Sequence, residues 1–182
     1  LLFILDASQT AGVVPTDMEA LCVDALCFTG HKSMYGPQGT GGICLGARFL
    51  PKPLLVGGSG SLSFSEAQPD FMPDLLEAGT LNGHGTAGLL AGVRYIKERG
   101  EEAVWHAPVR MADKLREMTG DIPGIEFYGC FGIPGRTALL SLNLPGYSSG
   151  EVADLLDERY DIAVRPGAHC APLLHSHFGT EK

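Results

Sequence analysis

The sequence of 182 residues has no long apolar run and little positive charge. No run approaches the roughly 20 apolar residues of a membrane-spanning helix, so we expect no membrane anchor. Lysine and arginine number 13 against 21 aspartates and glutamates, which gives a net charge of −8. Because binding to a phosphate backbone requires a basic surface, this charge argues against nucleic acid as the main partner.

Cysteine is also scarce: the chain has five, an odd number that is widely spaced. Such a set does not form the disulfide framework of a small secreted domain, and we expect a reducing, cytoplasmic location. Hydrophobic residues make up 45% of the chain and charged residues 19%. These proportions are typical of a globular protein that buries a core.

Apolar runs and helical spacing predict an α/β fold. The runs LLFILD (1–6), ALCFT (25–29) and GGICLG (41–46) predict strands, and the first should be covered on both faces. Thr16 and Glu19 have the spacing of a capping box, which predicts a short helix there. Helical spacing returns at GTAGLLAGVRYIKERG, which ends on a possible stop at Gly100 before a second helix through Met118.

The composition divides the chain into residues 1–104 and 105–182. Gly, Ser and Pro dominate from Pro51 to Pro73, which predicts a long functional or disordered loop. After residue 105 the elements become short, and we expect a small α+β domain. Its predicted elements are strands at 125–129, 137–144 and 161–167, with a helix that begins at Ser148 and has Glu151 at capping-box spacing. The chain opens inside an apolar run without methionine, so we interpret it as a piece of a longer protein.

Lys32 stands just after the second predicted strand and before a glycine-rich loop. A nucleotide P-loop requires the lysine directly after the last glycine, but His31 separates Gly30 from Lys32 and position 25 is alanine. The later glycines fail the G-x-G-x-x-G pattern because Cys44 fills the third position. Both nucleotide interpretations are therefore excluded, and a solvated turn lysine remains the simplest alternative.

The residues around this lysine indicate pyridoxal phosphate instead. Asp6 ends the first strand, at the sheet edge where α/β proteins bind ligands, and an acid there can keep the pyridine nitrogen protonated. Lys32 supplies an amine for covalent attachment. Thr29 and His31 flank the lysine and could hold phosphate oxygens, while Gln9 could reach the phenolic oxygen.

Cys170 is the candidate nucleophile of the second half. It follows His169 and the turn that begins at Arg165, in a segment too polar to be core. A thiolate is stabilised beside imidazole, arginine or backbone amides, and a loop on a rigid scaffold suits nucleophilic attack. A spectator cysteine is the alternative. A metal set of Cys170, His175 and His177 is too compressed and lacks a paired C-x-x-C, so we expect no metal site.

Four motifs in this order resemble the class V aminotransferase superfamily of fold-type I enzymes, and more narrowly the cysteine desulfurase and selenocysteine lyase family. DASQTAG (6–12) is followed by TGHKSMYGPQGTG (29–41). EAGTLN (77–82) is similar to the segment whose threonine, here Thr80, reaches the cofactor phosphate of the partner subunit. RPGAHCAPLLH (165–175) is similar to the catalytic-cysteine loop. The chain thus resembles a C-terminal fragment: residues 1–104 as part of the pyridoxal-phosphate-binding large domain, with a mostly parallel sheet, and residues 105–182 as a truncated small domain.

The resemblance implies a homodimeric cysteine desulfurase that converts L-cysteine to L-alanine. Pyridoxal phosphate would be covalent on Lys32, and Cys170 would carry the sulfur as a persulfide. A sulfur-acceptor protein would receive it for iron–sulfur cluster or related biosynthesis. The implied cofactor-binding residues are those given above: Asp6, Gln9, Thr29, His31, Lys32 and Thr80.

Alternatives within the same fold are a selenocysteine lyase, a C–S lyase and an aminotransferase, and outside it a non-catalytic truncated remnant. The family's ring-stacking histidine and substrate-carboxylate arginine have no counterpart in this sequence. We therefore expect the chain alone to bind the cofactor weakly or not at all, and to be inactive.

Overall fold

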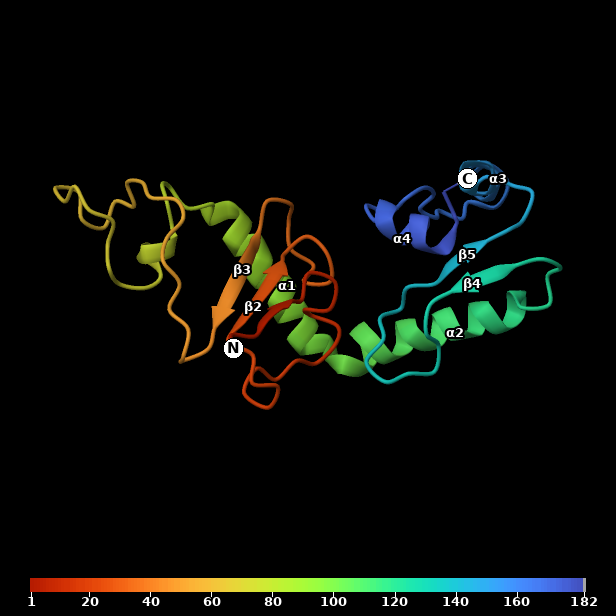
Figure 1. Cartoon of the computed structure of the whole chain (residues 1–182), viewed down its shortest axis with the longest axis horizontal. Coiled ribbons are helices and arrows are strands. Elements are labelled where there is room, and N and C mark those ends of the chain that lie inside the picture. Colours follow the sequence, from red (N-terminus) through yellow and green to blue (C-terminus); the bar gives the residue numbers. More distant parts are fainter. Residues whose placement is uncertain (182) are drawn as a thin grey trace. The chain divides into compact units, whose positions relative to one another are not determined.

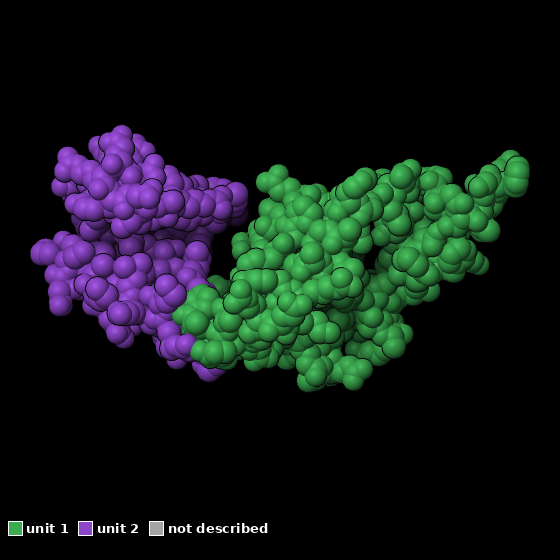
Figure 2. Space-filling model, turned by 180° about the vertical axis from the view of Figure 1, so that it is seen from behind, with its two compact units in different colours: residues 1–108, 135–137 green, residues 109–134, 138–182 purple. Residues whose placement is uncertain are grey.

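The computed structural model describes residues 1–181 and separates them into two compact units (Figure 1, Figure 2). The first unit comprises Leu1–Pro108 together with Gly135–Thr137. The second comprises Val109–Pro134 and the described residues from Ala138 onward. Trp105 explains why the short segment 135–137 joins the first unit, because its Nε1 donates to the carbonyl of Arg136 at 2.8 Å.

A three-stranded sheet forms the centre of the first unit. Its strands are β1 (Ile4–Asp6), β2 (Ala25–Thr29) and β3 (Gly41–Leu45), in that order. β1 pairs parallel with β2, whereas β3 pairs antiparallel with β2. All three strands predicted from the sequence are confirmed, although the first is shorter than its apolar run. The parallel pairing brings the carboxyl ends of β1 and β2 to the same edge of the sheet.

The prediction that the first strand is covered on both faces is wrong. Leu1 to Ile4 are exposed, and Ile4, on β1 itself, keeps 55% of its surface open. β1 is an edge strand that pairs with β2 alone. The small core lies beside it instead, where Ala7, Val23 and Leu26 are buried. Of the apolar run, Leu5 packs against this core, whereas Leu1 to Ile4 remain exposed within residues 1–181.

The helices of the first unit follow the predicted spacing. A 3-10 turn (Asp74–Leu76) precedes α1 (Gly83–Glu101), and a π-helical segment, η2 (Glu102–His106), follows it. Asn82 caps α1, since its side chain accepts a hydrogen bond from the Gly85 N–H at 2.9 Å. The predicted stop at Gly100 is confirmed, because Gly100 takes a left-handed φ of 73° that interrupts the helical backbone.

The short helix predicted around Thr16 and Glu19 is absent, and turns occupy this stretch. The hydroxyl of Thr16 donates back to the carbonyl of Val14 at 3.1 Å, so it caps nothing. The carboxylate of Asp17 accepts from the N–H groups of Glu19 and Ala20 at 2.9 and 3.0 Å. Aspartate thus satisfies the backbone locally, which stabilises a turn in competition with a helix.

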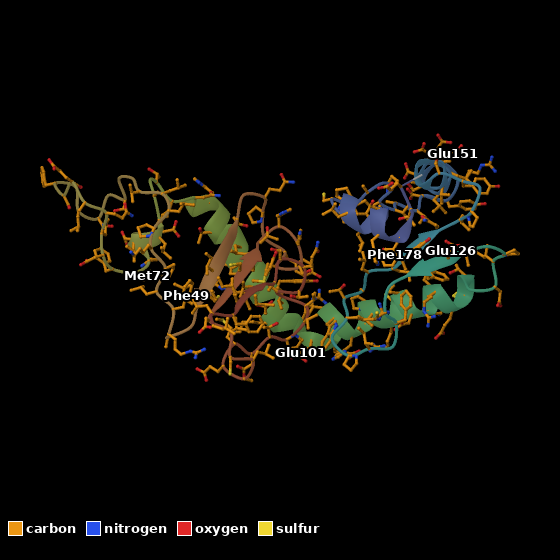
Figure 3. The ribbon with its side chains drawn as sticks, viewed as in Figure 1. Phe49, Met72, Glu101, Glu126, Glu151 and Phe178 are labelled. Carbon is orange, nitrogen blue, oxygen red and sulfur yellow. The ribbon has the colours of Figure 1, made fainter. Side chains whose placement is uncertain are left out.

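The long loop predicted from Pro51 to Pro73 is confirmed, and it ends near the 3-10 turn beyond Met72 (Figure 3). Gln68 ties its end down, because its Nε2 donates to the carbonyls of Asp74 and Glu77 at 2.7 and 3.1 Å. Most large apolar side chains of this loop are exposed. Those with more than two thirds of their surface open are Leu54, Leu55, Val56 and Phe64.

The second unit contains most of α2 (Ala107–Thr119) and four further elements. These are β4 (Glu126–Tyr128), β5 (Ser141–Asn143), α3 (Ser149–Tyr160) and α4 (Pro172–Phe178). β4 and β5 form a two-stranded antiparallel sheet, which confirms both predicted strands (Figure 1). The capping box of Ser148 and Glu151 at the start of α3 is also confirmed, and Glu151 is labelled in Figure 3.

The strand predicted at residues 161–167 does not form. Asp161 takes a left-handed conformation at the end of α3, with φ 55°. Pro166 has no N–H to offer a neighbouring strand, and the N–H of Gly167 donates instead to Ser149 Oγ at 3.1 Å. The segment is therefore fixed to the start of α3 rather than to a sheet. None of the helices within residues 1–181 has the length and apolar composition that crossing a bilayer requires.

Candidate functional site

The loop that carries Lys32 is closed by its own backbone. It leaves β2 at Thr29, and the N–H of Gly30 donates to the carbonyl of Thr40 at 2.8 Å. The carbonyl of Gly30 in turn accepts from Gly36 N–H at 2.7 Å, so the two ends of the loop are held together. The Lys32 side chain remains exposed on this loop. The structure thus presents an amine on a fixed backbone at the end of a central strand.

Helix α1 packs directly against this loop through glycines, which the sequence analysis did not single out. A Cβ added to Gly92 would overlap the carbonyl oxygen of Met34, and one added to Gly88 would lie 2.9 Å from a ring carbon of Pro37. Only glycine therefore allows the helix to approach so closely. The signal was present in the sequence: Gly85, Gly88 and Gly92 have the spacing of one helix face.

Asp6 and Lys32, which the sequence analysis assigned to one site, act on each other in the structure. Hydrogen bonds from the side chain and the N–H of Ser8 lower the pKa of Asp6, and the positive charge of Lys32 lowers it further. Desolvation opposes these effects but is outweighed. These effects favour the charged form of the carboxylate at the carboxyl end of β1.

The other residues predicted to bind the cofactor differ in their exposure and in their contacts. Gln9 lies next to the lysine loop, since its carbonyl accepts from Ser33 Oγ at 3.5 Å. Thr29 is half-buried at the end of β2, and His31 is exposed. Thr80 is exposed and makes no hydrogen bond within residues 1–181. Asn82, two residues after Thr80, contacts the glycine-rich loop, because its Nδ2 donates to the carbonyl of Gly39 at 3.5 Å.

Cys170 lies on an exposed loop of the second unit and is contacted by an arginine. The Nη2 of Arg165 donates to Cys170 Sγ at 3.2 Å. The ring Nε2 of His169 lies 2.5 Å from the carbonyl of Arg165, which closes the loop on itself. Arginine is among the groups that stabilise a thiolate, and the structure brings Arg165 to the sulfur.

The backbone at this cysteine is unusual. His169 and Cys170 both have positive φ angles, 51° and 62°. The N–H of Ala171 donates to the carbonyl of Ala168 at 2.8 Å, so the two residues occupy the centre of a tight turn with the backbone of type I′. Glycine and asparagine usually fill these positions, because other residues pay for the left-handed conformation. The tight turn thus places the exposed Cys170 at the tip of the loop.

No metal site competes with these interpretations in the part of the chain that the structure describes. There, no three side chains of His, Cys, Asp or Glu converge as metal ligands would. His175 instead accepts or donates at Nδ1 to the hydroxyl of Thr180 at 2.9 Å. The imidazole of His177 lies edge-on to the ring of Phe178.

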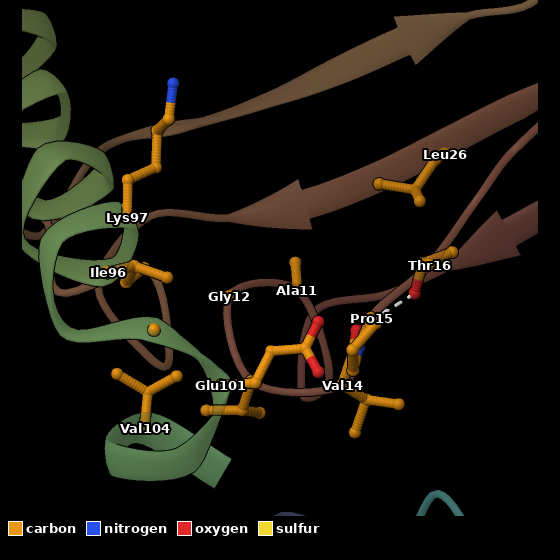
Figure 4. Close-up of a pocket in the computed structure, with 12 residues that line it drawn as sticks. Ala11, Gly12, Val14, Pro15, Thr16, Leu26, Ile96, Lys97, Glu101 and Val104 are labelled. Atoms are coloured by element: carbon orange, nitrogen blue, oxygen red, sulfur yellow. Dashed lines mark hydrogen bonds between the residues drawn. The ribbon is translucent and has the colours of Figure 1, made fainter.

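A pocket of about 380 Å³ lies between the loop that follows β1 and the C-terminal end of α1 (Figure 4). It is formed by the turn from Ala11 to Thr16 and by the end of α1, with Ile96 and Val104 on its wall. The carboxylate of Glu101 points toward the turn in Figure 4. Neither Asp6 nor Lys32 lines this pocket, so it is distinct from the candidate site.

The residues at the sheet edge fit pyridoxal phosphate chemically. A charged carboxylate that accepts from a protonated ring nitrogen is needed, and Asp6 is held in this state. An amine must lie close to that carboxylate, and the charge of Lys32 acts on it. The close packing of α1 against the loop and the hydrogen bonds between the loop's ends restrain the backbone around Lys32, which suits a covalent anchor.

Sequence comparison places the chain in a known family. The pattern described as Aminotransferase class-V matches residues 1–182. The chain belongs to the class V aminotransferase family.

Within that family, the similar proteins are described as cysteine desulfurases. A probable cysteine desulfurase of Methanothermobacter thermautotrophicus is 36% identical over 176 residues, which are 93% of this chain and 43% of that protein. One of Pyrococcus abyssi is 33% identical, again over 93% of this chain and 43% of the relative. The chain thus spans less than half the length of these curated relatives.

Solved structures agree on the fold. The apo cysteine desulfurase of Thermococcus onnurineus NA1 matches with a TM-score of 0.83 and 31% identity, over 98% of this chain and 45% of that one. The Escherichia coli cysteine desulfurase CsdA matches with a TM-score of 0.87 and 28% identity, over the whole chain and 45% of that one. The chain therefore has the fold of a fold-type I enzyme that depends on pyridoxal phosphate, in the portion that it covers.

Proposed function

We propose that this chain is the C-terminal part of a cysteine desulfurase that depends on pyridoxal phosphate. The observation that carries the proposal is a charged Asp6 at the carboxyl edge of two parallel strands, within the electrostatic influence of Lys32 on the loop that follows β2. The relatives that are described as cysteine desulfurases support it, as does a cysteine on an arginine-bound loop of the second unit. The substrate is L-cysteine, and the products are L-alanine and enzyme-bound sulfur.

In this proposal the residues of the first unit bind and orient the cofactor. Lys32 holds it covalently through Nζ, and Asp6 accepts from its ring nitrogen. Gln9, Thr29 and His31 contact its phenolic oxygen and phosphate, and Thr80 reaches the phosphate bound by the partner subunit. Pyridoxal phosphate, when bound, supplies the electron withdrawal that labilises bonds at the substrate α-carbon. The Nζ of Lys32 would also serve to move the proton at that carbon.

The thiolate of Cys170 attacks the sulfur of the substrate. An S–S bond forms as the substrate's C–S bond breaks, and the electron pair of the broken bond stays with carbon, which takes a proton to yield alanine. The guanidinium of Arg165, 3.2 Å from Sγ, stabilises negative charge on the attacking sulfur. A persulfide on an exposed loop tip can then pass its outer sulfur to an acceptor protein.

The proposal extends to the whole protein. In this proposal residues 1–104 belong to the large domain and residues 105–182 to the small C-terminal domain, whereas the compact units divide between Pro108 and Val109, with residues 135–137 in the first unit. The exposed apolar side chains of the loop from Pro51 to Pro73 support a homodimer, because a patch of this kind is typical of a protein interface. All five cysteines are free of disulfides, which supports a cytoplasmic enzyme that supplies sulfur for iron–sulfur clusters or related biosynthesis.

The test uses the full-length protein that contains this chain, with pyridoxal phosphate and L-cysteine. We expect alanine and persulfide to form in equal amounts in a single turnover without reductant. Cys170→Ala should abolish both products while the cofactor's visible absorbance remains. Lys32→Ala should abolish the absorbance retained after borohydride reduction and desalting, whereas the control Lys97→Ala, exposed on α1, should retain it.

Each alternative predicts a different result in the same assay. Sulfide production that survives Cys170→Ala would indicate a C–S lyase without a persulfide. Turnover of selenocysteine but not of cysteine would indicate a selenocysteine lyase. Amino-group transfer to a keto acid would indicate an aminotransferase. Full-length protein that never retains the cofactor would contradict the proposal and leave a non-catalytic remnant.

A further inference from the structure

Ser8 contacts the carboxylate of Asp6 with two donors, and no role has been assigned to it so far. Its backbone N–H donates to Oδ1 of Asp6 at 2.9 Å, and its hydroxyl donates to the same oxygen at 2.5 Å. Oδ1 therefore accepts two hydrogen bonds, which fills its two lone pairs. Within residues 1–181, Oδ2 accepts none.

The backbone around this pair is fixed by Ala7, which is fully buried between the two polar residues. The N–H of Ala7 donates to the carbonyl of Cys27 at 2.8 Å, which continues the pairing of β1 with β2. Its carbonyl accepts from the N–H groups of Thr10 and Ala11 at 3.0 and 2.8 Å. Asp6 and Ser8 are thus held on the same side of a rigid turn, and the Ser8 hydroxyl fixes the rotation of the carboxylate.

The charge state of Asp6 is set mainly by the same serine. The hydroxyl of Ser8 has the largest effect in lowering the pKa of Asp6, and the Ser8 N–H has the next largest. An O–H···O⁻ distance of 2.5 Å is at the short, strong end of charge-assisted hydrogen bonds. Lys32 is the charged group within residues 1–181 whose field also acts on this carboxylate.

We infer that Ser8 is a positioning residue for the cofactor: its hydroxyl occupies Oδ1 of Asp6 and leaves Oδ2 to accept from the protonated ring nitrogen. The inference rests on the proposed function, since it assumes that Asp6 faces pyridoxal phosphate. Ser8 stands between Asp6 and Gln9 in the same DASQ segment.

A purely structural role in the turn makes a different prediction. The Ser8 N–H, which an alanine retains, is sufficient to close the local turn on Asp6. Ser8→Ala should then change neither the titration of Asp6 nor cofactor binding. Ser8→Thr keeps a hydroxyl on the same carbon and serves as the conservative variant.

The first experiment titrates the side-chain carboxyl of Asp6 by carbon-13 NMR in the cofactor-free, full-length protein. Removal of the hydroxyl should raise the proton affinity of this carboxyl about tenfold in Ser8→Ala, and Ser8→Thr should restore most of the change. Ser33→Ala is the matched control, because the Ser33 hydroxyl is also near Lys32 but contacts a backbone carbonyl at 3.5 Å instead of a carboxylate. An unchanged titration in Ser8→Ala would overturn the inference.

The second experiment measures the dissociation constant of pyridoxal phosphate for the same variants. Ser8→Ala should weaken binding about tenfold, Ser8→Thr should bind nearly as the unaltered protein does, and Ser33→Ala should not differ from it. Unaltered protein that binds the cofactor, together with equal binding by Ser8→Ala, would overturn this inference alone. Unaltered protein that binds no cofactor would overturn the proposed function as well, whatever the titration shows.

Discussion

The lysine loop and the cysteine loop carry the two reactive groups, and they are held in different ways. The lysine loop is fixed by backbone hydrogen bonds between its own ends and by the glycine face of α1. The cysteine loop is exposed throughout and is fixed by side chains: Arg165 to the sulfur, His169 to the backbone and Ser149 to Gly167.

This difference matches the proposed roles. A covalent cofactor has to remain in one orientation through a catalytic cycle, which favours a loop locked by packing and backbone. A cysteine that receives sulfur and passes it on has to be accessible, which favours a loop tip held by a few reversible contacts. We therefore expect substitutions around the lysine loop to affect stability and cofactor retention. Substitutions around the cysteine loop should affect the reactivity of the thiol.

The largest expected effect comes from Arg165. Arg165→Ala removes the donor to Cys170 Sγ, and we expect alanine formation to fall about tenfold to a hundredfold, the usual range for a hydrogen bond to a charged group. Alkylation of Cys170 by iodoacetamide, followed by mass spectrometry, should slow as well, while the melting temperature changes little. Arg159→Ala, in the last turn of α3, is the control. Equal alkylation rates in the two variants would contradict this role.

The counterpart in the lysine loop is Gly92. A Cβ there overlaps the carbonyl of Met34, so Gly92→Ala should lower the free energy of unfolding by about 1–3 kcal/mol, as overpacking does. Because the displaced backbone carries Lys32, cofactor retention should fall with it. Gly83→Ala is the matched control, since a Cβ at Gly83 meets no atom within 4 Å. Urea unfolding of both variants measures the difference, and equal midpoints would show that the helix does not clamp the loop.

The smallest expected effect concerns pH and the anchoring of β1. Buried Asp24 accepts from the Phe3 N–H at 2.9 Å and pairs with Arg48 at 2.9 Å. The Phe3 hydrogen bond, and then the charge of Arg48, lower the pKa of Asp24 from its ordinary 3.8. Its contribution to stability is therefore complete above pH 3.8 and is lost as the pH falls through the lower value in the folded protein.

Thermal unfolding between pH 7 and pH 2 tests this dependence. Asp24→Asn should be less stable than the unaltered protein at pH 7, and the gap should narrow at the acidic end. Asp70→Asn, at an exposed position in the long loop, should follow the unaltered protein throughout. A constant gap across the pH range would mean that the charge of Asp24 does not contribute.

The sequence predicted the elements whose signals are local. Strands β2 and β3, the break at Gly100 and the capping box of Ser148 and Glu151 each follow from residues within one element. Two predicted elements failed because side chains compete with regular structure: Asp17 closes a turn, and Pro166 together with Ser149 removes a strand. In both segments, hydrogen bonds between a polar side chain and the backbone stabilise a turn or loop in place of the predicted helix or strand.

For the candidate site, the sequence identified the reactive residues but not what holds them. Asp6 and Lys32 could be assigned to one site from the sequence, because the carboxyl ends of two parallel strands lie at the same edge of a sheet. The contacts of Ser8 with Asp6 and of Gly92 with Met34 depend on atoms brought together by folding. A motif records the spacing of residues along the chain, whereas these contacts depend on rotamers and on the approach of a helix.

The exposed edge of β1 has a consequence for the solubility of this chain when it is produced alone. Apolar side chains around an unpaired strand edge offer both hydrogen-bonding groups and hydrophobic surface to any passing chain, which is the pattern that promotes aggregation. Residues 1–181 produced alone should therefore accumulate in inclusion bodies, and their solubility should depend on how quickly the edge of β1 is paired.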